Sequence, residues 1–370
     1  MQIKLQGKCG VVGENRMEKI KLTDICNPKQ WKTIPTSELL ENGYPVYGAN
    51  GIIGYYSEFN HKNPVITVTC RGATCGTINI TVPKSYVTGN AMCLDDMRSD
   101  IYMEYLYYCL KHYNFNNVIS GSAQPQITRQ GMEKIYVTIG SHNEQMDIVD
   151  KLKKVENVIG LRKRELKQLD TLVKSRFAEM FGDPIRNPKG WKVVTIGDIV
   201  TEVRYGTSKP AVEGGKYPYL RMNNLTADGH LDLNDLKYID ISDDEVEKCV
   251  VRKGDVLFNR TNSIDLVGKT AVFDLQDDMV IAGYIIRVRL NEKILPEVLS
   301  QYMNLEALKD ILRSMAKGAV NQANINAQEL QSIRVYVPDI ELQKQFVEMK
   351  DQVDKSKSKI QKSLEETQLL

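Results

Sequence analysis

The sequence has no run of about 18 apolar residues, the length that a membrane-spanning helix requires. Its first 16 residues lack the apolar core of a secretory signal. The seven cysteines include no C-x-x-C pair and the four histidines are scattered, so no metal-ligand spacing is present. We therefore expect a cytoplasmic protein with buried, reduced thiols, without a metal and without a membrane partner.

Several enzyme signatures are also absent. There is no P-loop, because residues 206–209 are too short to form one. The Asn/Asp-Pro-Pro-aromatic tetrapeptide of an adenine methyltransferase does not occur, since residues 27–31 and 187–191 lack the second proline. No Ser-His-Asp or Cys-His arrangement stands out, and the acidic residues 243–245 are interpreted as a solvated helix start. The sequence thus predicts a non-catalytic chain with no cofactor of its own.

Composition indicates an ordinary globular protein of two domains. The 370 residues are 42% hydrophobic and 26% charged, and either half is long enough to bury a core. The formal net charge is only +2, so there is no overall attraction for nucleic acid. Any DNA-binding surface would need local segregation of charge.

One long helix dominates the sequence. Residues 141–182 contain no proline and a single glycine, Gly160. Apolar residues recur there in steps of three and four, the seam of a coiled coil, with Arg162 and Arg176 interrupting it. The seam consists of Ile148, Leu152, Val155, Ile159, Leu166, Leu169, Val173 and Met180. About 40 residues give a rod of roughly 60 Å, which needs a partner to cover its apolar stripe.

A second helix with the same seam ends the chain, with Phe346, Val353, Ile360 and Leu364 on the stripe. We therefore predict an α+β fold with two β-rich globular domains separated by two long antiparallel coiled-coil helices. The predicted divisions are a leader at 1–16, whose order stays open, a first domain at 17–141, a helix at 142–182, a second domain at 183–338 and a final helix at 339–370.

The two halves repeat. Residues 124–127 match residues 322–325 at an offset of 198 (322 − 124), and the match continues without a gap through both helices. It pairs Gln145 with Gln343 and Val155 with Val353. Upstream, residues 22–25 match 196–199 at an offset of 174 (196 − 22), so the domains differ by insertions. At the 198 offset the second helix stops about ten residues before its counterpart.

Two similar domains on paired helices form a pseudo-twofold frame that suits recognition of two short sites at a fixed spacing. Duplex DNA fits this arrangement, because successive accessible faces of its major groove are about 34 Å apart. The alternative is a coiled-coil scaffold or oligomerisation protein without sequence-specific DNA binding. That alternative explains the helices but gives no reason for two β-rich domains with divergent polar loops.

The chain resembles the specificity subunit of type I restriction-modification enzymes in several segments and in their order around the two helices. The segments are residues 44–55, 71–77, 124–127, 190–198 and 252–257. The resemblance implies two target recognition domains, each recognising one half of a bipartite, asymmetric DNA site. It also implies that the helices dock two methyltransferase (modification) subunits, which restriction/translocase subunits then join. S-adenosylmethionine, ATP and Mg²⁺ would be bound only by those partner subunits.

Candidate DNA-binding residues in the first domain are polar side chains in loops. They are Tyr47, Asn50, Arg71, Thr74, Ser120, Ser122, Gln124 and Gln126. Arg can pair bidentately with guanine, and Gln or Asn with adenine. A surface ion pair is the alternative for Arg71. The two glutamines have matching Gln322 and Asn324 in the other domain, which favours a loop-fixing role for them.

In the second domain, the candidates include arginines, whose guanidinium groups are forked donors, and asparagines, whose side chains are amides, after segments predicted to be strands. They are Lys209, Arg221, Asn223, Asn224, Arg260, Asn262, Lys269 and Lys317. For the asparagines, turn formation is the open alternative. The tyrosines at 105, 107, 108 and 113 have helical spacing and are interpreted as core residues, not as a base-stacking platform.

Overall fold

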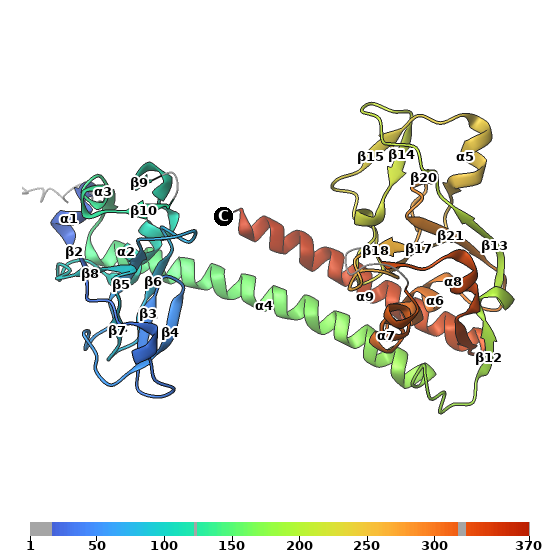
Figure 1. The fold of residues 1–370 in the computed structure, drawn as a ribbon, viewed down its shortest axis with the longest axis horizontal. Helices are drawn as coiled ribbons and strands as arrows, with labels where there is room; N and C mark the ends of the chain where they lie inside the picture. The colour runs from blue at the N-terminus through green and yellow to red at the C-terminus, as the bar shows by residue number, and fades with distance from the viewer. Residues whose placement is uncertain (1–16, 122–123, 317–322, 370) are drawn as a thin grey trace, which may run out of the picture. The chain divides into compact units, whose positions relative to one another are not determined.

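The computed structural model describes residues 17–121, 124–316 and 323–369 (Figure 1). The chain divides into two compact units, Met1–Val158 (unit 1) and Ile159–Leu370 (unit 2). Helix α4 (His142–Phe181) contributes its first part to unit 1 and its second part to unit 2. The predicted leader lies outside the described residues. Within the described ranges, no helix is both long enough and apolar enough to cross a bilayer.

Unit 1 contains a four-stranded antiparallel sheet of order β2-β8-β5-β6 and a three-stranded sheet of order β4-β3-β7. Strand β3 pairs antiparallel with β4 and parallel with β7. The strands are β1 (Glu18–Lys21), β2 (Asn27–Gln30), β3 (Tyr44–Gly48), β4 (Gly51–Tyr56), β5 (Ile66–Thr69), β6 (Ile78–Ile80), β7 (Tyr86–Val87), β8 (Ala91–Asp95), β9 (Ile119–Ser120), β10 (Gln126–Ile127) and β11 (Tyr136–Ile139). The helices are α1 (Leu22–Ile25), α2 (Met103–His112) and α3 (Arg129–Met132).

Unit 2 repeats this plan with a sheet of order β13-β21-β17-β19 and another of order β15-β14-β20-β16. Its strands are β12 (Lys192–Thr195), β13 (Val200–Tyr205), β14 (Tyr217–Leu220), β15 (Lys237–Ile239), β16 (Val250–Val251), β17 (Val256–Asn259), β18 (Thr261–Asn262), β19 (Thr270–Val272), β20 (Met279–Ile281), β21 (Ile285–Leu290), β22 (Ala323–Asn324) and β23 (Arg334–Val337). Its helices are α5 (Asp243–Cys249), α6 (Pro296–Met303), α7 (Glu306–Met315), α8 (Ala327–Ser332) and α9 (Ile340–Gln368).

The two units share most of their strand pairings, although the second sheet of unit 2 has one additional strand, β16. In the second sheet of each, β14 pairs antiparallel with β15 and parallel with β20, as β3 does with β4 and β7. Strands β1 and β11 form an antiparallel pair that β12 and β23 reproduce, shifted by the offsets of 174 and 198 residues that the sequence predicts. The predicted α+β class with an internal repeat is therefore confirmed.

A buried glutamine begins each long helix at equivalent positions. Gln145 accepts a hydrogen bond from the Tyr102 backbone and donates to the carbonyl of Asp100, and Gln343 makes the corresponding bonds to Leu295 and Lys293. Both glutamines are at most 1% exposed. A buried amide needs such partners, so the side chain ties each helix to the loop before α2 or α6.

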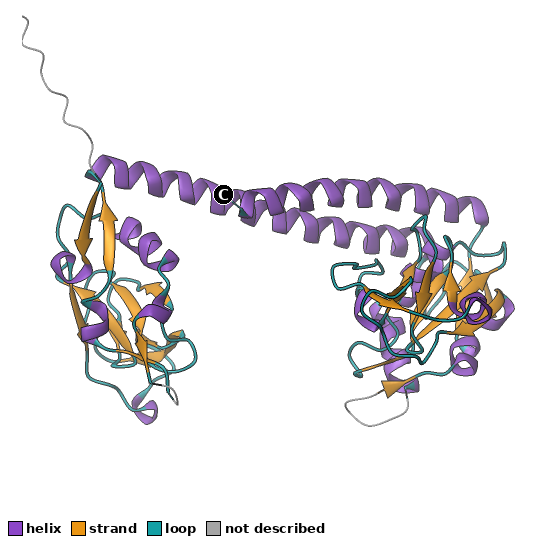
Figure 2. Cartoon of the chain, turned by 90° about the horizontal axis from the view of Figure 1, so that it is seen from above, coloured by secondary structure: helices purple, strands orange, loops and turns teal. Residues whose placement is uncertain are grey.

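The second part of α4 and α9 lie side by side and antiparallel within unit 2 (Figures 1 and 2). Arg162 donates 2.5 Å to the carbonyl oxygen of Ser363, and Lys357 pairs with Asp170 at 2.6 Å. Arg162, which interrupts the predicted seam, thus bonds to the opposite helix. The interface is completed by aromatic residues outside the predicted seam, chiefly Phe177, which is fully buried.

The tyrosine stripe of α2 faces the core of unit 1, as predicted. Tyr105 is 6% exposed, and Tyr107, Tyr108 and Tyr113 pack against the same cluster. Every described cysteine is a free thiol, either buried or half-buried.

Candidate nucleic-acid interface

Three loops of unit 1 meet at one edge of the four-stranded sheet. Hydroxyl Oγ1 of Thr69, at the end of β5, donates to the carbonyl of Ala49 in the β3–β4 turn at 2.5 Å. Beyond β5, Arg71 forms a bridge to Gln126, which pairs in turn with Ser120. This edge gathers six predicted residues, all exposed: Asn50, Arg71, Thr74, Ser120, Gln124 and Gln126.

One prediction in unit 1 needs correction. Tyr47 is only 6% exposed and packs in a small core beside Trp31 and Val87. Its hydroxyl accepts a hydrogen bond from the Val82 backbone at 3.1 Å. The ring therefore supports the sheet and has no surface for DNA. Ser122, also a candidate, lies outside the described residues.

Unit 2 has a polar cleft of about 560 Å³ that brings together three predicted cations, Lys209, Arg221 and Arg260. Arg260 lies over the ring of Tyr205, 5.0 Å from its centroid, and donates to Oδ1 of Asn324 at 2.9 Å. A guanidinium stacked on an aromatic ring keeps its in-plane donors available for another acceptor.

The other two cations of this cleft are paired with carboxylates. Lys209 lies 2.5 Å from Glu245 and Arg221 lies 2.8 Å from Asp235. The Nε atoms of Arg221 and Arg260 are buried without a hydrogen-bond partner among the described residues. These two Nε atoms are enclosed by protein, so any acceptor bound in the cleft would meet the terminal nitrogens of the two guanidinium groups instead.

Two further predictions in unit 2 need correction. Asn224 is 2% exposed and its amide joins the Arg221 backbone to the Asp232 carbonyl, each at 2.8 Å. Lys269 is 9% exposed and donates to the backbone carbonyl of Met222 at 3.0 Å, and its burial lowers its pKa. Both side chains hold the residue 221–225 turn and are not free for DNA.

The remaining candidates of unit 2 are less constrained. Asn223 is exposed, whereas half-buried Asn262 accepts from the Ser263 backbone at 2.9 Å, as a turn-forming asparagine would. Lys317 lies outside the described residues.

The candidate edges of the two units are topologically equivalent. The backbone of Ile127 donates to the carbonyl of Cys70 at 3.0 Å, and Ile325 donates to Arg260 at 2.9 Å. Cys70 follows β5 and Arg260 follows β17, the corresponding strands of the two sheets. The frame at this position is therefore shared, while the side chains that it presents differ.

Two exposed aromatic residues at or beside this cleft are not among the predicted residues: Tyr284 lines the cleft, and Tyr205 contacts Arg260. Tyr205, which stacks on Arg260, is 45% exposed, and the lining residue Tyr284 is 48% exposed. Tyr205 directly precedes the polar loop that contains Lys209, a position that could have marked it. Tyr284 stands within a strand-like run and gave no such signal.

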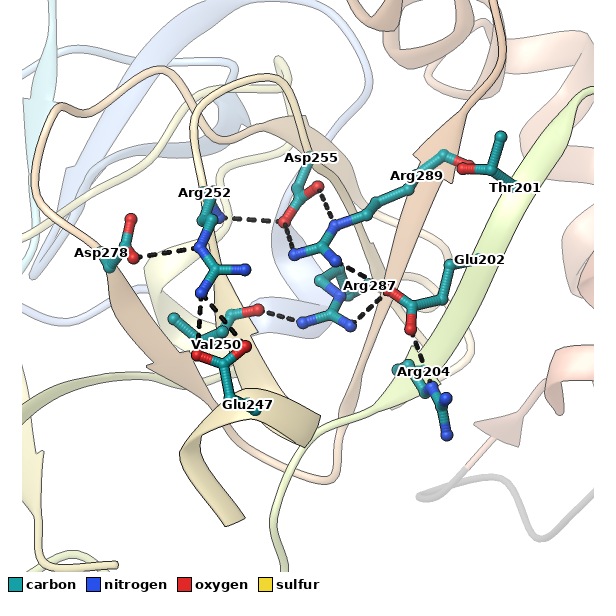
Figure 3. A network of polar contacts seen from close by, with 10 residues as sticks. All are labelled: Thr201, Glu202, Arg204, Glu247, Val250, Arg252, Asp255, Asp278, Arg287 and Arg289. Carbon is teal, nitrogen blue, oxygen red and sulfur yellow. Dashed lines mark hydrogen bonds and ion pairs between the residues drawn. The ribbon is translucent and has the colours of Figure 1, made fainter. Parts of the chain in front are cut away.

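The segment 252–257 has a structural role (Figure 3). Asp255 is 5% exposed; its Oδ2 accepts from the Arg252 backbone at 2.9 Å and its Oδ1 accepts from Arg289 at 3.0 Å. Arg289 also contacts Glu202, which pairs with the buried Arg287 at 2.7 Å. This segment of the resemblance therefore maintains the sheet and does not itself face the cleft.

His230 couples a loop of unit 2 to α9. Its Nδ1 lies 3.2 Å from Asp228 and its Nε2 lies 3.3 Å from Asp354. Hydrogen bonding with Asp228, and then with Asp354, raises the pKa of His230 to about 9, although burial opposes this. Lys350 lies 2.5 Å from Asp354, and Lys357 lies 3.3 Å from Asp228.

Unit 2 should lose stability as the pH rises from about 6.5 to about 9. The ordinary pKa of 6.5 applies to the unfolded chain, so the His230 ion pairs contribute fully below it and are lost through the folded value of about 9. Because the side chain is 36% exposed, we expect a loss of only about 1 kcal/mol. Urea midpoints across this range measure it, and the His230→Gln variant should show a flatter profile. An unchanged profile would exclude His230 as the cause.

These features define an internally repeated α+β protein with one polar, loop-built edge in each repeat. The model of the type I restriction modification DNA specificity domain matches residues 14–171 and again 188–367. The chain therefore belongs to this family.

Similar proteins with assigned names are also type I restriction enzyme specificity subunits. The chain is 30% identical over 182 residues to the putative type I restriction enzyme MjaX specificity subunit of Methanocaldococcus jannaschii, covering 48% of this chain and 43% of that protein. It is 24% identical over 273 residues to the type I restriction enzyme EcoKI specificity subunit of Escherichia coli, covering 68% and 59%. The chain thus spans about half the length of these relatives.

A solved structure of the S subunit of a type I restriction-modification system from M. genitalium has the same fold. Its TM-score is 0.59 at 14% identity, and the match covers 97% of this chain and 95% of that one. A structure from a study of complex assembly in a type I system also scores 0.59, at 19% identity.

Proposed function

We propose that this chain is the DNA sequence-specificity subunit of a type I restriction-modification enzyme. Each unit recognises one half of a bipartite, asymmetric site in double-stranded DNA. The observation that carries the proposal is the repeated edge, where Arg71 pairs with Gln126 in unit 1 and Thr261 pairs with Asn324 in unit 2, while Arg260 stands where unit 1 has Cys70. Different side chains at equivalent places suit recognition of two different half-sites.

Arg260 is the side chain that we expect to contribute most in unit 2. It combines a forked donor that lines the cleft with an aromatic platform on Tyr205. Lys209 and Arg221 are then suited to phosphate contacts, with exchange of Glu245 and Asp235 for phosphate oxygens. In unit 1, Arg71 and Thr74 extend from the equivalent edge.

The chain itself would be non-catalytic and cytoplasmic. Methylation would be performed by two methyltransferase subunits docked on the long helices, and cleavage by restriction/translocase subunits that join them. S-adenosylmethionine, ATP and Mg²⁺ would bind only those partners. Exposed apolar residues on α4, Met146, Val158, Leu161 and Leu172, support a docking role for the helix.

Selection from a randomised duplex pool tests the proposal. The chain, with and without methyltransferase partners, should enrich a consensus of two short half-sites with a fixed spacer. Failure to enrich any sequence under both conditions would instead favour the scaffold function. Binding of S-adenosylmethionine by the isolated chain would contradict the assignment of catalysis to the partners.

Replacing Arg260 with alanine should relax one position of one half-site. The expected cost is about 1–3 kcal/mol for the preferred base pair, because a bidentate contact to a base edge would be lost. The measurement is the selected consensus together with affinities for single-base variants of the site. Arg252→Ala is the matched control, since Arg252 is paired with Glu247 and Asp278 outside the cleft. Equal weakening on all sequences would make Arg260 a phosphate contact and contradict its role in specificity.

A further inference from the structure

Three side chains of different chemistry meet beside the four-stranded sheet of unit 1. Cys93 and Asp95 lie two residues apart on β8 and so face the same side of the strand, and His61 reaches them from the loop after β4. One ligand atom from each of the three lies within 4.8 Å of the others. Cys93 is fully buried, and the side chains of His61 and Asp95 are 10% and 12% exposed.

The backbone of Val87 fixes how His61 is protonated. Its N–H donates to Oδ1 of Asn60 at 2.9 Å, and its carbonyl accepts from Nδ2 of Asn60 at 3.0 Å. The amide of Asn60 therefore has only one orientation, with Oδ1 as an acceptor. Since Nδ1 of His61 lies 2.7 Å from that same Oδ1, Nδ1 must carry a proton and donate it.

With its proton on Nδ1, neutral His61 has a lone pair on Nε2. That atom lies 3.0 Å from Oδ1 of Asp95, which is also an acceptor, while Trp31 donates to the other carboxylate oxygen at 3.0 Å. Two acceptors face each other at this distance only when a proton, held by the ring or by the carboxyl group, or a cation lies between them. Either such a proton or a cation meets that need, and the thiol of Cys93 beside the pair favours a metal cation.

We propose that His61 Nε2, Cys93 Sγ and Asp95 Oδ1 form a binding site for a divalent transition-metal cation of the zinc type. A nitrogen, sulfur and oxygen set is the donor chemistry of Zn²⁺, and one thiolate with one carboxylate balances its double charge. The bound ion replaces the thiol proton of Cys93, which passes to solvent. A cleft of about 450 Å³, lined by His61 and Asp95, leaves room for water as a fourth ligand.

The surroundings are those of a supported metal site. Asn60 orients the histidine through its remote nitrogen, and Trp31 holds the second oxygen of the carboxylate. Such outer partners fix ligand direction and typically change affinity 10- to 100-fold. A bound ion would fasten the residue 60–61 loop to β8. None of its ligands is among the residues proposed to contact DNA. The sequence gave no ligand-spacing signal for them, because the chain between His61 and Cys93 includes three strands, β5, β6 and β7.

Cobalt(II) titration of the full-length, chelator-treated chain tests the site. We expect one equivalent to produce thiolate-to-cobalt charge-transfer absorption and the visible bands of a tetrahedral ion, and one equivalent of Zn²⁺ to remove both. Mg²⁺ should not compete. The Cys93→Ser variant should lose the charge-transfer band, whereas Cys249→Ser, which changes a buried thiol of unit 2, should keep it. Absence of the band, or its survival in Cys93→Ser, would overturn the proposal.

Ring-nitrogen NMR of the unmodified chain gives a test that does not depend on a variant folding. His61 should show a protonated Nδ1, and its Nε2 resonance should shift when Zn²⁺ is added. Competition should show binding at least about 10-fold weaker in Asn60→Ala, which removes the orienting amide. A doubly protonated ring whose resonances do not respond to Zn²⁺ would establish an ion pair with Asp95 alone and overturn the metal site.

Discussion

Replacing Phe177 with alanine should lower the free energy of unfolding of unit 2 by about 3–5 kcal/mol. Phe177 is fully buried, and its ring centroid lies 4.8 Å from that of Phe181 and 5.3 Å from that of Phe346. Truncation would leave a cavity where α4 meets α9 and the core of unit 2. Phe181 and Phe346 also contact each other, and Tyr302 contacts Tyr336, so the surrounding rings keep other partners and can collapse only in part.

Urea unfolding followed by Trp191 fluorescence measures this effect in a Trp31→Phe background, which leaves Trp191 as the only tryptophan. Trp191 donates to the carbonyl of Phe181 at 2.8 Å and so reports on the end of α4. Leu172→Ala is the matched control on the same helix, because Leu172 is 43% exposed and should cost less than about 0.5 kcal/mol. Similar losses in both variants would contradict the packing described here.

Replacing Arg287 with alanine should cost unit 2 about 3–5 kcal/mol. Arg287 is 1% exposed, donates to Glu202 at 2.7 Å and also hydrogen-bonds the carbonyl oxygen of Val250 (Figure 3). Its removal leaves a void in the sheet and deprives that carbonyl of its side-chain donor. Glu202 retains Arg289, so the loss combines packing with one broken ion pair.

The Arg204→Ala variant distinguishes the effect of burying Arg287 on stability from the effect of its ion pair with Glu202. Arg204 contacts the same carboxylate, Glu202, at 3.0 Å, but its side chain is 58% exposed. An exposed ion pair contributes about 0–1 kcal/mol, so this variant should be close to the unmodified chain in the same urea experiment. If Arg204→Ala and Arg287→Ala were equally destabilising, the buried position of Arg287 would not be the source of its effect.

The repeat was predictable because it is visible in the sequence itself, as a regular spacing of apolar residues and a constant offset between matching residues. The spacing of apolar residues indicated both long helices. The constant offset of 198 residues identified Gln145 and Gln343 as equivalent positions in the two repeats. The fold explains this equivalence, since each glutamine accepts a hydrogen bond from the loop before α2 or α6 and must therefore keep its position in the helix relative to that loop. The seam was less complete, because it omitted Phe177, whose partner Phe346 comes from the second helix.

The candidate site could be predicted only as a set of residue types. Arg71 is exposed and Arg260 is half-buried at the polar edges, and their role in binding DNA stays a prediction. Tyr47, Asn224 and Lys269 had similar local sequence features but are buried. The hydrogen-bond partners of Tyr47 and Lys269 lie in other segments, so no local pattern distinguishes these two, whereas Asn224 bonds to the nearby Arg221 backbone, in keeping with the turn-forming alternative.

By itself, the sequence determined the class of fold, the two long helices and the doubling of the plan, because periodicity and repetition are properties of neighbouring or regularly offset residues. The tertiary structure decided which polar side chains reach the surface, which arginine is buried and which distant residues meet. The assembly of His61, Cys93 and Asp95 belongs to this second group. The physical reason is that burial and pairing depend on contacts between strands far apart in the chain, and those contacts exist only once the sheets have formed.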